Sequence, residues 1–530
     1  MRELHAEVVV IGGGLGGVAA ALGALRAGRS VLLTEEYEWL GGQLTSQAVP
    51  PDEHTWVEQF GVTASYRALR DGIRAYYRRH YPLTDRARLT RDLNPGAGHV
   101  SRLCHEPRVA VAVIEAMLAP YRGSGLLQVL TGFIPVAAET EGDRVSSVTV
   151  RGAGEELVLS GPYIVDATET GELLPLTGTE FVTGFESRAE TGEPSGPDVA
   201  DPANMQAFSV CFAIDHVDGD HTIDRPARYD FWRDYQPAFW GAKMLSWQTP
   251  NPRTLRTSTR SFTPNPDDDP AAVNADQRAS PGDGNLWTFR RIAARRNFVD
   301  GAYPSDICLV NWPMIDYFEA PIIPDPADHL ARARELSFSV LYWLQTEAPR
   351  PDGGTGWKGL RLRGDVTGGA DGLAMAPYIR ESRRIRAEYT IVEQDLSLAV
   401  RGDKGSVSYA DSIGVGMYRI DLHPSTGGDN YIDVGSCPFE IPLGALIPQR
   451  VENLLPAGKN IGTTHITNGS HRLHPVEWNV GEVAGILADF CLGRAVTPRA
   501  VRNTPALLAD FQERLAADGV ELRWPDISGY

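Results

Sequence analysis

The first 35 residues carry a hydrophobic pattern that predicts a strand, a turn, a helix and a second strand. Residues 6–11 are apolar except for Glu7 and rich in valine, as expected of a strand buried on both faces of a parallel sheet. The glycine-rich stretch 12–17 predicts a turn. Residues 18–27 are rich in alanine and leucine and predict a helix that stops at Gly28, and residues 30–35 predict the second strand.

The rest of the chain alternates between strand-like and helical patterns. Short apolar runs broken by turn residues predict several strands within 127–167. Another strand is expected from Asn453, and a loop then leads to a last helix over 475–491, whose apolar side chains share one face. Further helices are expected over 55–80, 107–121 and 328–346.

The glycines after the first strand have the spacing Gly12-x-Gly14-x-x-Gly17, which is typical of a turn that binds a dinucleotide pyrophosphate. Gly12 allows the tight turn, Gly14 lets the backbone approach the phosphates, and Gly17 lets the helix pack close to the sheet. Glu35 ends the second strand, where a carboxylate accepts hydrogen bonds from a ribose. The sequence therefore predicts a dinucleotide site, and this fingerprint alone leaves NAD and FAD open.

Three further segments favour FAD because they resemble parts of known flavoproteins. Gly41-Gly42-Gln43 resembles a second glycine pair that runs along the cofactor, and residues 163–168 resemble a strand that ends at the cofactor with an Ala-Thr pair. Residues 453–460 resemble the C-terminal strand whose end meets the flavin ribityl chain. With the glycine fingerprint, the chain resembles the FAD-dependent oxidoreductases of the glutathione reductase-like superfamily, best over 1–180 and 435–495.

This resemblance implies an α/β fold with a Rossmann-type FAD-binding domain that is discontinuous in sequence. The first part of that domain is expected at 1–180 and the second at 435–495. An inserted substrate or cap domain is expected over 181–434, followed at the end of the chain by a C-terminal extension over 496–530. The residues expected to bind FAD are Gly12, Gly14, Gly17, Glu35, Gly41, Gly42, Gln43, Arg102, Ala167, Gly458 and Asn460.

The chain departs from the family pattern directly after the last strand. The usual Gly-Asp pair is Gly458-Lys459 here. The contact that the aspartate normally makes with the ribityl chain is therefore expected to come from Asn460 or from backbone groups.

Histidines next to the last helix are the first candidates for catalysis. His471 and His474 lie just before or at the start of that helix, whose N-terminus faces the flavin in the family that the chain resembles. A histidine there could accept a proton from a substrate hydroxyl or amine near neutral pH. His105, beside Arg102, forms a second candidate group. The alternative is that these histidines stabilise loops or fill the core.

The resemblance implies oxidation of a small organic substrate by hydride transfer from carbon to flavin N5, with oxygen or another acceptor reoxidising the flavin. One alternative is a flavin reductase-type enzyme that receives electrons from a free nicotinamide or a partner protein. Another is a non-redox protein that keeps FAD as a structural cofactor.

Composition and charge narrow the classes of partner. The net charge of −18 argues against a nucleic-acid partner. The five cysteines form no C-x-x-C pair, which argues against a zinc or iron–sulfur site and fits a reducing compartment. No apolar run is long enough to cross a bilayer, and no metal site is expected. We therefore expect a cytoplasmic enzyme, and a homo-oligomer remains open.

Overall fold

A computed structural model describes residues 2–270, 284–324 and 326–527. Its central element is a five-stranded sheet in which all neighbouring strands run parallel. The order is β23 (Leu454–Pro456), β8 (Tyr163–Asp166), β2 (Val8–Ile11), β3 (Val31–Glu35) and β4 (Leu127–Thr131). Helix α1 (Leu15–Arg26) connects β2 to β3, which confirms the strand–turn–helix–strand unit predicted from the first 35 residues.

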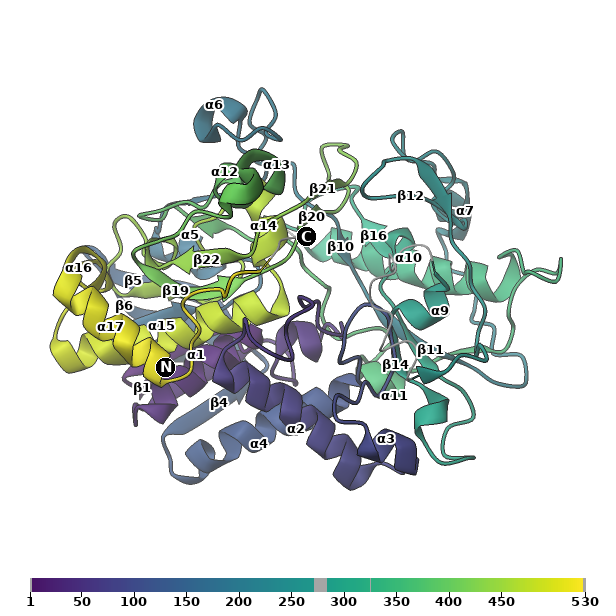
Figure 1. Ribbon diagram of the computed structural model, residues 1–530, viewed down its shortest axis with the longest axis horizontal. Helices are drawn as coiled ribbons and strands as arrows, with labels where there is room; N and C mark the ends of the chain where they lie inside the picture. The colour runs from purple at the N-terminus through teal and green to yellow at the C-terminus, as the bar shows by residue number, and fades with distance from the viewer. Residues whose placement is uncertain (1, 271–283, 325, 528–530) are drawn as a thin grey trace.

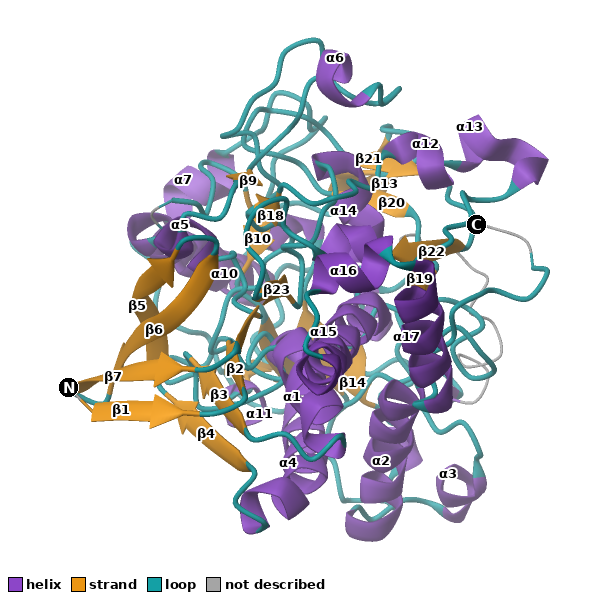
Figure 2. Ribbon diagram, turned by 90° about the vertical axis from the view of Figure 1, so that its left-hand side faces the viewer, coloured by secondary structure: helices purple, strands orange, loops and turns teal. Residues whose placement is uncertain are grey.

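The parallel sheet is covered on both faces, which explains the continuous apolar run in β2. Val8 and Val10 belong to the core cluster that contains the apolar residues of α1, whereas Val9 and Ile11 belong to a second cluster. That second cluster includes residues of a four-stranded sheet, drawn at the left of Figure 2. The strands of that sheet, in order, are β1 (Arg2–His5), β7 (Glu155–Ser160), β6 (Arg144–Gly152) and β5 (Phe133–Glu141).

Helix α15 (His474–Arg494) packs against α1, so the two ends of the chain meet in one domain (Figure 1). Two glycines of α15 allow this close approach. A Cβ atom at Gly481 would lie 2.0 Å from the carbonyl oxygen of Gly16, and one at Gly485 would lie 2.0 Å from that of Ala20. The packing places the N-terminus of α15 beside the glycine turn.

The other predicted helices are present, with shifted ends. Helix α2 (Ala64–His80) starts later than the expected residue 55, because the Thr63 side chain caps it by accepting from Tyr66 N–H. Helices α4 (Pro107–Gly123) and α10 (Ala327–Thr346) match their predictions closely. The remaining helices of four or more residues are α3 (Asp85–Leu89), α5 (Leu173–Thr177), α6 (Arg188–Thr191), α7 (Tyr229–Asp234), α9 (Leu286–Phe289), α11 (Gly364–Thr367), α12 (Glu393–Leu396), α13 (Leu398–Arg401), α14 (His465–His471), α16 (Pro498–Asn503) and α17 (Pro505–Ala517).

The expectation of an unbroken loop between the last strand and the last helix is wrong. Residues His465–His471 form α14 inside that segment. The Thr464 side chain accepts a hydrogen bond from Thr467 N–H and thereby caps the helix, a local signal that the sequence reading did not use.

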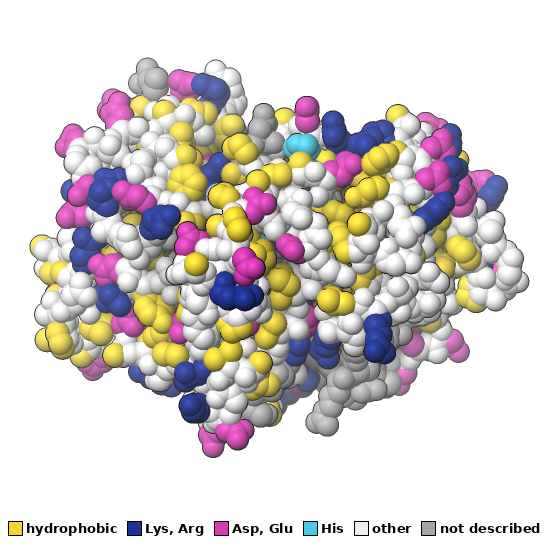
Figure 3. All heavy atoms as spheres, turned by 90° about the horizontal axis from the view of Figure 1, so that it is seen from above, with side chains coloured by type: hydrophobic (Ala, Val, Ile, Leu, Met, Phe, Trp, Pro, Cys, Tyr) yellow, Lys and Arg dark blue, Asp and Glu magenta, His cyan; other side chains and the backbone are white. Residues whose placement is uncertain are grey.

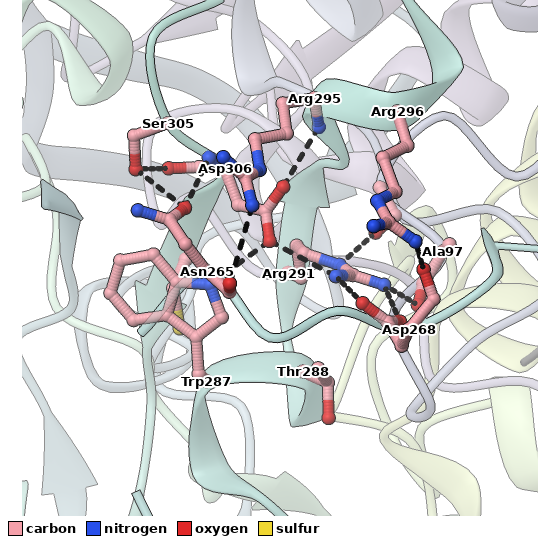
Figure 4. A network of polar contacts seen from close by, with 12 residues as sticks. Ala97, Asn265, Asp268, Trp287, Thr288, Arg291, Arg295, Arg296, Ser305 and Asp306 are labelled. Atoms are coloured by element: carbon pink, nitrogen blue, oxygen red, sulfur yellow. Dashed lines mark hydrogen bonds and ion pairs between the residues drawn. The ribbon is translucent and has the colours of Figure 1, made fainter. Parts of the chain in front are cut away.

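Strands from the middle of the chain form a further four-stranded sheet, which is antiparallel. Its order is β14 (Arg291–Ala293), β15 (Ile307–Val310), β11 (Phe212–His216) and β17 (Leu360–Leu362). The buried Arg291 of β14 joins this sheet to the N-terminal part (Figure 4). Its guanidinium donates to Asp306 at 3.0 Å and Asp268 at 2.6 Å, and its Nε donates to the Gly96 carbonyl at 2.8 Å.

Part of the predicted inserted segment packs on the dinucleotide-binding side. Strand β18 (Arg384–Ile385) pairs with β9 (Phe181–Val182), and Ile385 N–H donates to the carbonyl of Asn460. Ile385 also shares the second core cluster with Val9. The domain limits at residues 180, 434 and 495 stay a prediction. The other short strands are β10 (Phe208–Ser209), β12 (Gln248–Pro250), β13 (Thr257–Thr259), β16 (Asp316–Tyr317), β19 (Ser412–Gly416), β20 (Ile420–Leu422), β21 (Ile432–Val434) and β22 (Phe439–Pro442).

Surface charge, the cysteines and the apolar character of the helices complete the description of the fold. On the face seen in Figure 3, basic and acidic side chains are interspersed. All five cysteines are buried, and none forms a disulfide within the described residues. Among the helices of the described ranges, none has both the length and the apolar character needed to cross a bilayer.

Candidate functional site

The glycine turn after β2 requires glycine at the predicted positions. Gly12 has a φ of +98°, and a Cβ there would lie 2.3 Å from the carbonyl oxygen of Ala167 at the end of β8. A Cβ at Gly17 would lie 1.9 Å from the Gly12 carbonyl oxygen, and one at Gly14 would lie 3.0 Å from Glu169 Oε1. These three glycines therefore let β2, β8 and the start of α1 meet at one point.

Glu35 lies beside this turn at the end of β3. Its Oε2 accepts a hydrogen bond of 2.8 Å from Gly13 N–H, and its Oε1 accepts one of 3.0 Å from Tyr37 N–H. Burial raises the pKa of this carboxyl to about 8. The structure thus places Glu35 against the turn, as the fingerprint predicts.

The second glycine pair lies across the same turn. Gly41 and Gly42 have φ angles of +105° and +47°, and a Cβ at Gly42 would lie 2.9 Å from Gly14 Cα. Gln43 Nε2 donates to the Arg472 carbonyl at 3.1 Å and to Glu477. These contacts join the turn to the N-terminal end of α15.

Ala167, Gly458 and Asn460 meet where β8 and β23 end. Asn460 Nδ2 donates to the Asp166 carbonyl at 3.0 Å, and its Oδ1 accepts from Gly458 N–H at 3.1 Å. Burial raises the pKa of Asp166 to about 7. Asn460 therefore holds the two strand ends together.

Lys459, the departure from the family pattern, is the centre of a buried ion cluster. Its Nζ lies 2.6 Å from Glu169 Oε2 and 3.5 Å from Glu477 Oε2. Burial alone would lower the pKa of Lys459, but the two carboxylates raise it, so the ammonium stays charged. Glu477 Oε1 also accepts from Gly16 N–H at 3.4 Å, in the place that an anion takes at a helix N-terminus.

Buried polar atoms near this cluster show that the residues fit a bound group. Gln43 Oε1 and both amide atoms of Gln47 are buried and have no hydrogen-bond partner among the described residues. The glycine turn and the α1 N-terminus supply backbone donors and Glu35 supplies the acceptor that a dinucleotide needs, whereas the charge of Lys459 is taken up by Glu169 and Glu477. We conclude that these residues fit a dinucleotide cofactor.

The three candidate catalytic histidines are all buried. His471 Nδ1 lies 2.9 Å from the Thr467 carbonyl, His474 Nδ1 accepts from Asp52 N–H at 3.1 Å, and His105 Nδ1 lies 3.0 Å from the Glu106 carbonyl. Burial lowers the pKa of His471 and of His105 to about 4 and that of His474 well below its usual value. In the described part of the chain, the Nε2 atom of each of these three has no hydrogen-bond partner.

A cavity of about 650 Å³ adjoins the cofactor residues. One of its lining residues contacts them directly, since the Arg472 carbonyl accepts from Gln43. A second lining residue, Asp52, donates its N–H to Nδ1 of the candidate catalytic His474. Arg102, which the sequence predicts to bind FAD, also lines the cavity. The wall comes from segments within 52–55, 99–102, 251–260, 286–290, 311–313, 378–380 and 418–433, and from Arg472. His105, His471 and His474 are not among the described residues that line it.

His423 is one of three histidines among the described residues that line the cavity, and no sequence pattern marked it as a candidate. His423 Nδ1 lies 2.6 Å from Oδ2 of the fully buried Asp316, and its Nε2 lies 3.9 Å from Asp421 Oδ2. Arg380 and the Ser209 hydroxyl also contact Asp316, at 3.0 Å and 2.7 Å. The pair carries no local motif, because 107 residues separate its members.

Comparison with known proteins identifies a family. The model of the family described as "FAD dependent oxidoreductase" matches residues 7–515. No curated protein sequence matches the chain.

Solved structures are similar to limited parts of the chain. They include L-proline dehydrogenase from P. horikoshii, with 14% identity over 35% of this chain and 25% of that chain and a TM-score of 0.19. The OxyS anhydrotetracycline hydroxylase from Streptomyces rimosus has 19% identity over 42% and 38%, with a TM-score of 0.22. The p-nitrophenol 4-monooxygenase PnpA from Pseudomonas putida DLL-E4 has 16% identity over 40% and 49%, with a TM-score of 0.24.

In each of these three pairs, this chain covers less than half of the solved protein. The family match, by contrast, extends over nearly the whole sequence and agrees with the glycine turn, Glu35 and the parallel sheet. The chain belongs to the family of FAD-dependent oxidoreductases, with FAD as its cofactor.

Proposed function

We propose that this FAD-dependent oxidoreductase oxidises a small organic substrate, bound in the 650 Å³ cavity, by hydride transfer to flavin N5. The observation that carries the proposal is His423, which lines this cavity and lies 2.6 Å from the carboxylate of the buried Asp316. A volume of this size suits a small molecule. The hydrogen bond from Gln43 to the Arg472 carbonyl supports this, because Arg472 lines the cavity and Gln43 is one of the residues that fit the cofactor.

FAD, when bound, supplies the two-electron acceptor for the hydride that leaves the substrate carbon. His423 accepts the proton that leaves the substrate oxygen or nitrogen, so that a C–O or C–N single bond becomes a double bond. The two electrons then pass to oxygen or to another acceptor.

The electrostatics of the pair suit a proton acceptor. Burial, together with nearby Arg380, lowers the pKa of His423, so its imidazole is neutral near pH 7. The pKa of Asp316 falls to about 2, because Arg380 and His423 outweigh the opposing effect of its burial. The Asp316 carboxylate therefore keeps the proton of His423 on Nδ1 and leaves Nε2 free to accept another.

The test is anaerobic reduction of the bound flavin by a panel of alcohols, amines, sugars, hydroxy acids and amino acids, followed by admission of air. We expect one class to bleach the flavin and air to restore its colour. Bleaching by free NADH or NADPH alone would favour the reductase alternative. Flavin that no compound in the panel and neither nicotinamide reduces would favour a structural role for FAD.

Protein variants, assayed in the same reaction, identify the residue that accepts the proton. With the substrate found, His423→Asn is expected to slow flavin reduction about 10²- to 10⁴-fold at unchanged FAD content. The roles predicted for His105, His471 and His474 are tested by single alanine variants. If one of these slows reduction by that factor and His423→Asn does not, the proton acceptor is on the cofactor side.

A further inference from the structure

The cavity is rich in positive charge, although the protein as a whole carries a net charge of −18. Among the described residues that line it there are seven arginines and four carboxylates. One of these carboxylates, Glu53, is neutralised by Arg70, which does not line the cavity, and another, Asp433, pairs with Arg419 of the wall itself. A cavity wall with this excess of arginine attracts an anion.

Arg290 is the most exceptional of these arginines. It is only 9% exposed, yet within the described residues its Nε and Nη1 atoms have no hydrogen-bond partner. The carboxylate paired with it, Asp52, lies 3.6 Å away, which is beyond a good hydrogen bond. A buried guanidinium with two unused donors is costly unless a ligand accepts from it.

Arg472 lies in the same part of the cavity. It is 3% exposed, and its two terminal nitrogens donate to the Tyr378 hydroxyl at 3.2 Å and the Asp421 carbonyl at 3.0 Å. Its Nε, however, is buried without a partner in the described ranges. Arg290 and Arg472 both line the cavity, and the charge of Asp52 raises the pKa of both guanidinium groups, so the two groups lie in one region.

Neighbouring lining residues add further unused donors and an apolar surface. The Asn311 amide nitrogen, the Trp312 indole N–H and the Tyr431 hydroxyl are buried without a hydrogen-bond partner, as far as the described chain shows. Phe289 and Trp312 contribute aromatic rings to the same wall. The wall therefore offers hydrogen-bond donors and aromatic surface to one ligand.

We propose that the substrate is an organic acid, whose carboxylate is held by Arg290 and Arg472 while its ring-bearing body lies against the aromatic wall. This inference rests on the proposed function, because it names the class of molecule that the oxidation site accepts. A carboxylate has two acceptor oxygens that match the planar guanidinium group, which a neutral alcohol or amine lacks.

The experiment measures binding to the oxidised FAD-loaded enzyme and needs no turnover. Benzoate is titrated while the flavin absorbance spectrum is recorded, and benzamide, which has nearly the same shape without the charge, is titrated in parallel. We expect benzoate to perturb the spectrum and to bind at least 10-fold more tightly than benzamide.

Variants locate the carboxylate. Arg290→Gln is expected to weaken benzoate binding roughly 10- to 100-fold and to leave benzamide binding nearly unchanged. Arg290→Lys keeps the charge and should give an intermediate loss. Arg233→Gln removes an arginine that forms surface ion pairs with Asp230 and Asp234, and serves as the charge control with unchanged affinity.

Equal affinity of the parent enzyme for benzoate and benzamide, or no benzoate binding up to its solubility limit, would overturn the inference even if no Arg290 variant folds. Unchanged benzoate affinity in a folded Arg290→Gln variant would do the same. If benzoate binds as expected but no compound reduces the flavin, only the proposed oxidation fails. If neutral alcohols or amines reduce the flavin and benzoate does not bind, only the organic-acid inference fails.

Discussion

The Nδ1 atom of His423 lies 2.6 Å from Oδ2 of Asp316, in the wall of the cavity that adjoins the cofactor residues. Asp316 is fully buried and has its carboxylate held by Arg380 and Ser209 as well. A carboxylate fixed in this way sets both the tautomer and the orientation of the imidazole.

Asp316→Asn should therefore slow substrate-driven flavin reduction about 10²- to 10⁴-fold, because the asparagine amide no longer selects the Nδ1-protonated tautomer. Rapid mixing under anaerobic conditions measures the rate, and the flavin absorbance measures FAD content, which should not change. Ser209→Ala removes another hydrogen bond to Asp316 and is the matched control, with an expected change of only a few-fold. A rate for Asp316→Asn within threefold of the parent would rule out this role.

The rate of flavin reduction should depend on pH through His423. Burial and Arg380 lower the pKa of His423 from its usual 6.5, and only the neutral imidazole accepts a proton. The rate is therefore expected to be constant around pH 7 and to fall as the pH drops through a value below 6.5. Reduction rates measured between pH 4.5 and 8 test this expectation. In His423→Asn, the fall of the rate at low pH should disappear. If the rate of the parent enzyme instead fell with a midpoint above pH 7, His423 would not be the proton acceptor.

Gly14→Val should abolish FAD binding. A Cβ at this position already lies 3.0 Å from Glu169 Oε1, and the larger side chain would enter the space that the pyrophosphate needs. The measurement is the flavin content of the purified protein. Gly123→Val, at the end of α4 where nothing lies within 4 Å of a new Cβ and φ is not left-handed, controls for the cost of losing a glycine. A yellow Gly14→Val protein with the parent's FAD content would disprove the placement.

The stability of the FAD-free protein should fall as the pH rises, in part because of Glu35. Burial raises its pKa to about 8, so the folded state binds this proton more tightly than the unfolded chain. The stabilisation is fully present below about pH 4.5 and is lost as the pH rises to about 8. Glu35→Gln should flatten the dependence of Tm on pH between 5 and 8. Identical slopes for variant and parent would show that Glu35 titrates normally.

Lys459→Met should destabilise the protein by about 3–5 kcal/mol, because it leaves the buried Glu477 and the partly buried Glu169 without their shared cation. Denaturant unfolding measures the loss. Adding Glu169→Gln to this variant removes one of the two facing carboxylates and should restore part of the stability. No recovery in the double variant would mean that Lys459 acts through packing rather than through charge.

Local sequence patterns were enough to predict the cofactor half of the site. The strand, glycine turn, helix and Glu35 lie within 35 consecutive residues, and each has a backbone or spacing requirement that only a few residue types meet. The resemblance also predicted that the chain comes back to the N-terminal sheet at residues 453–460, and β23 does pair with β8 of that sheet. Helix α14 was missed, because its signal is a Thr464 cap rather than an apolar period.

Whether the residues predicted to bind FAD contact it stays a prediction, whereas the cavity and the His423–Asp316 contact emerged only from the tertiary structure. His423 and Asp316 lie 107 residues apart, and the cavity wall is assembled from eight separate parts of the chain. The sequence contains many arginines, but burial and the positions of neighbouring carboxylates decide which of them keep unused donors, as Arg290 and Arg472 do. The same holds for the buried histidines, because a pKa depends on desolvation and on charges brought close by folding, not on neighbours in sequence.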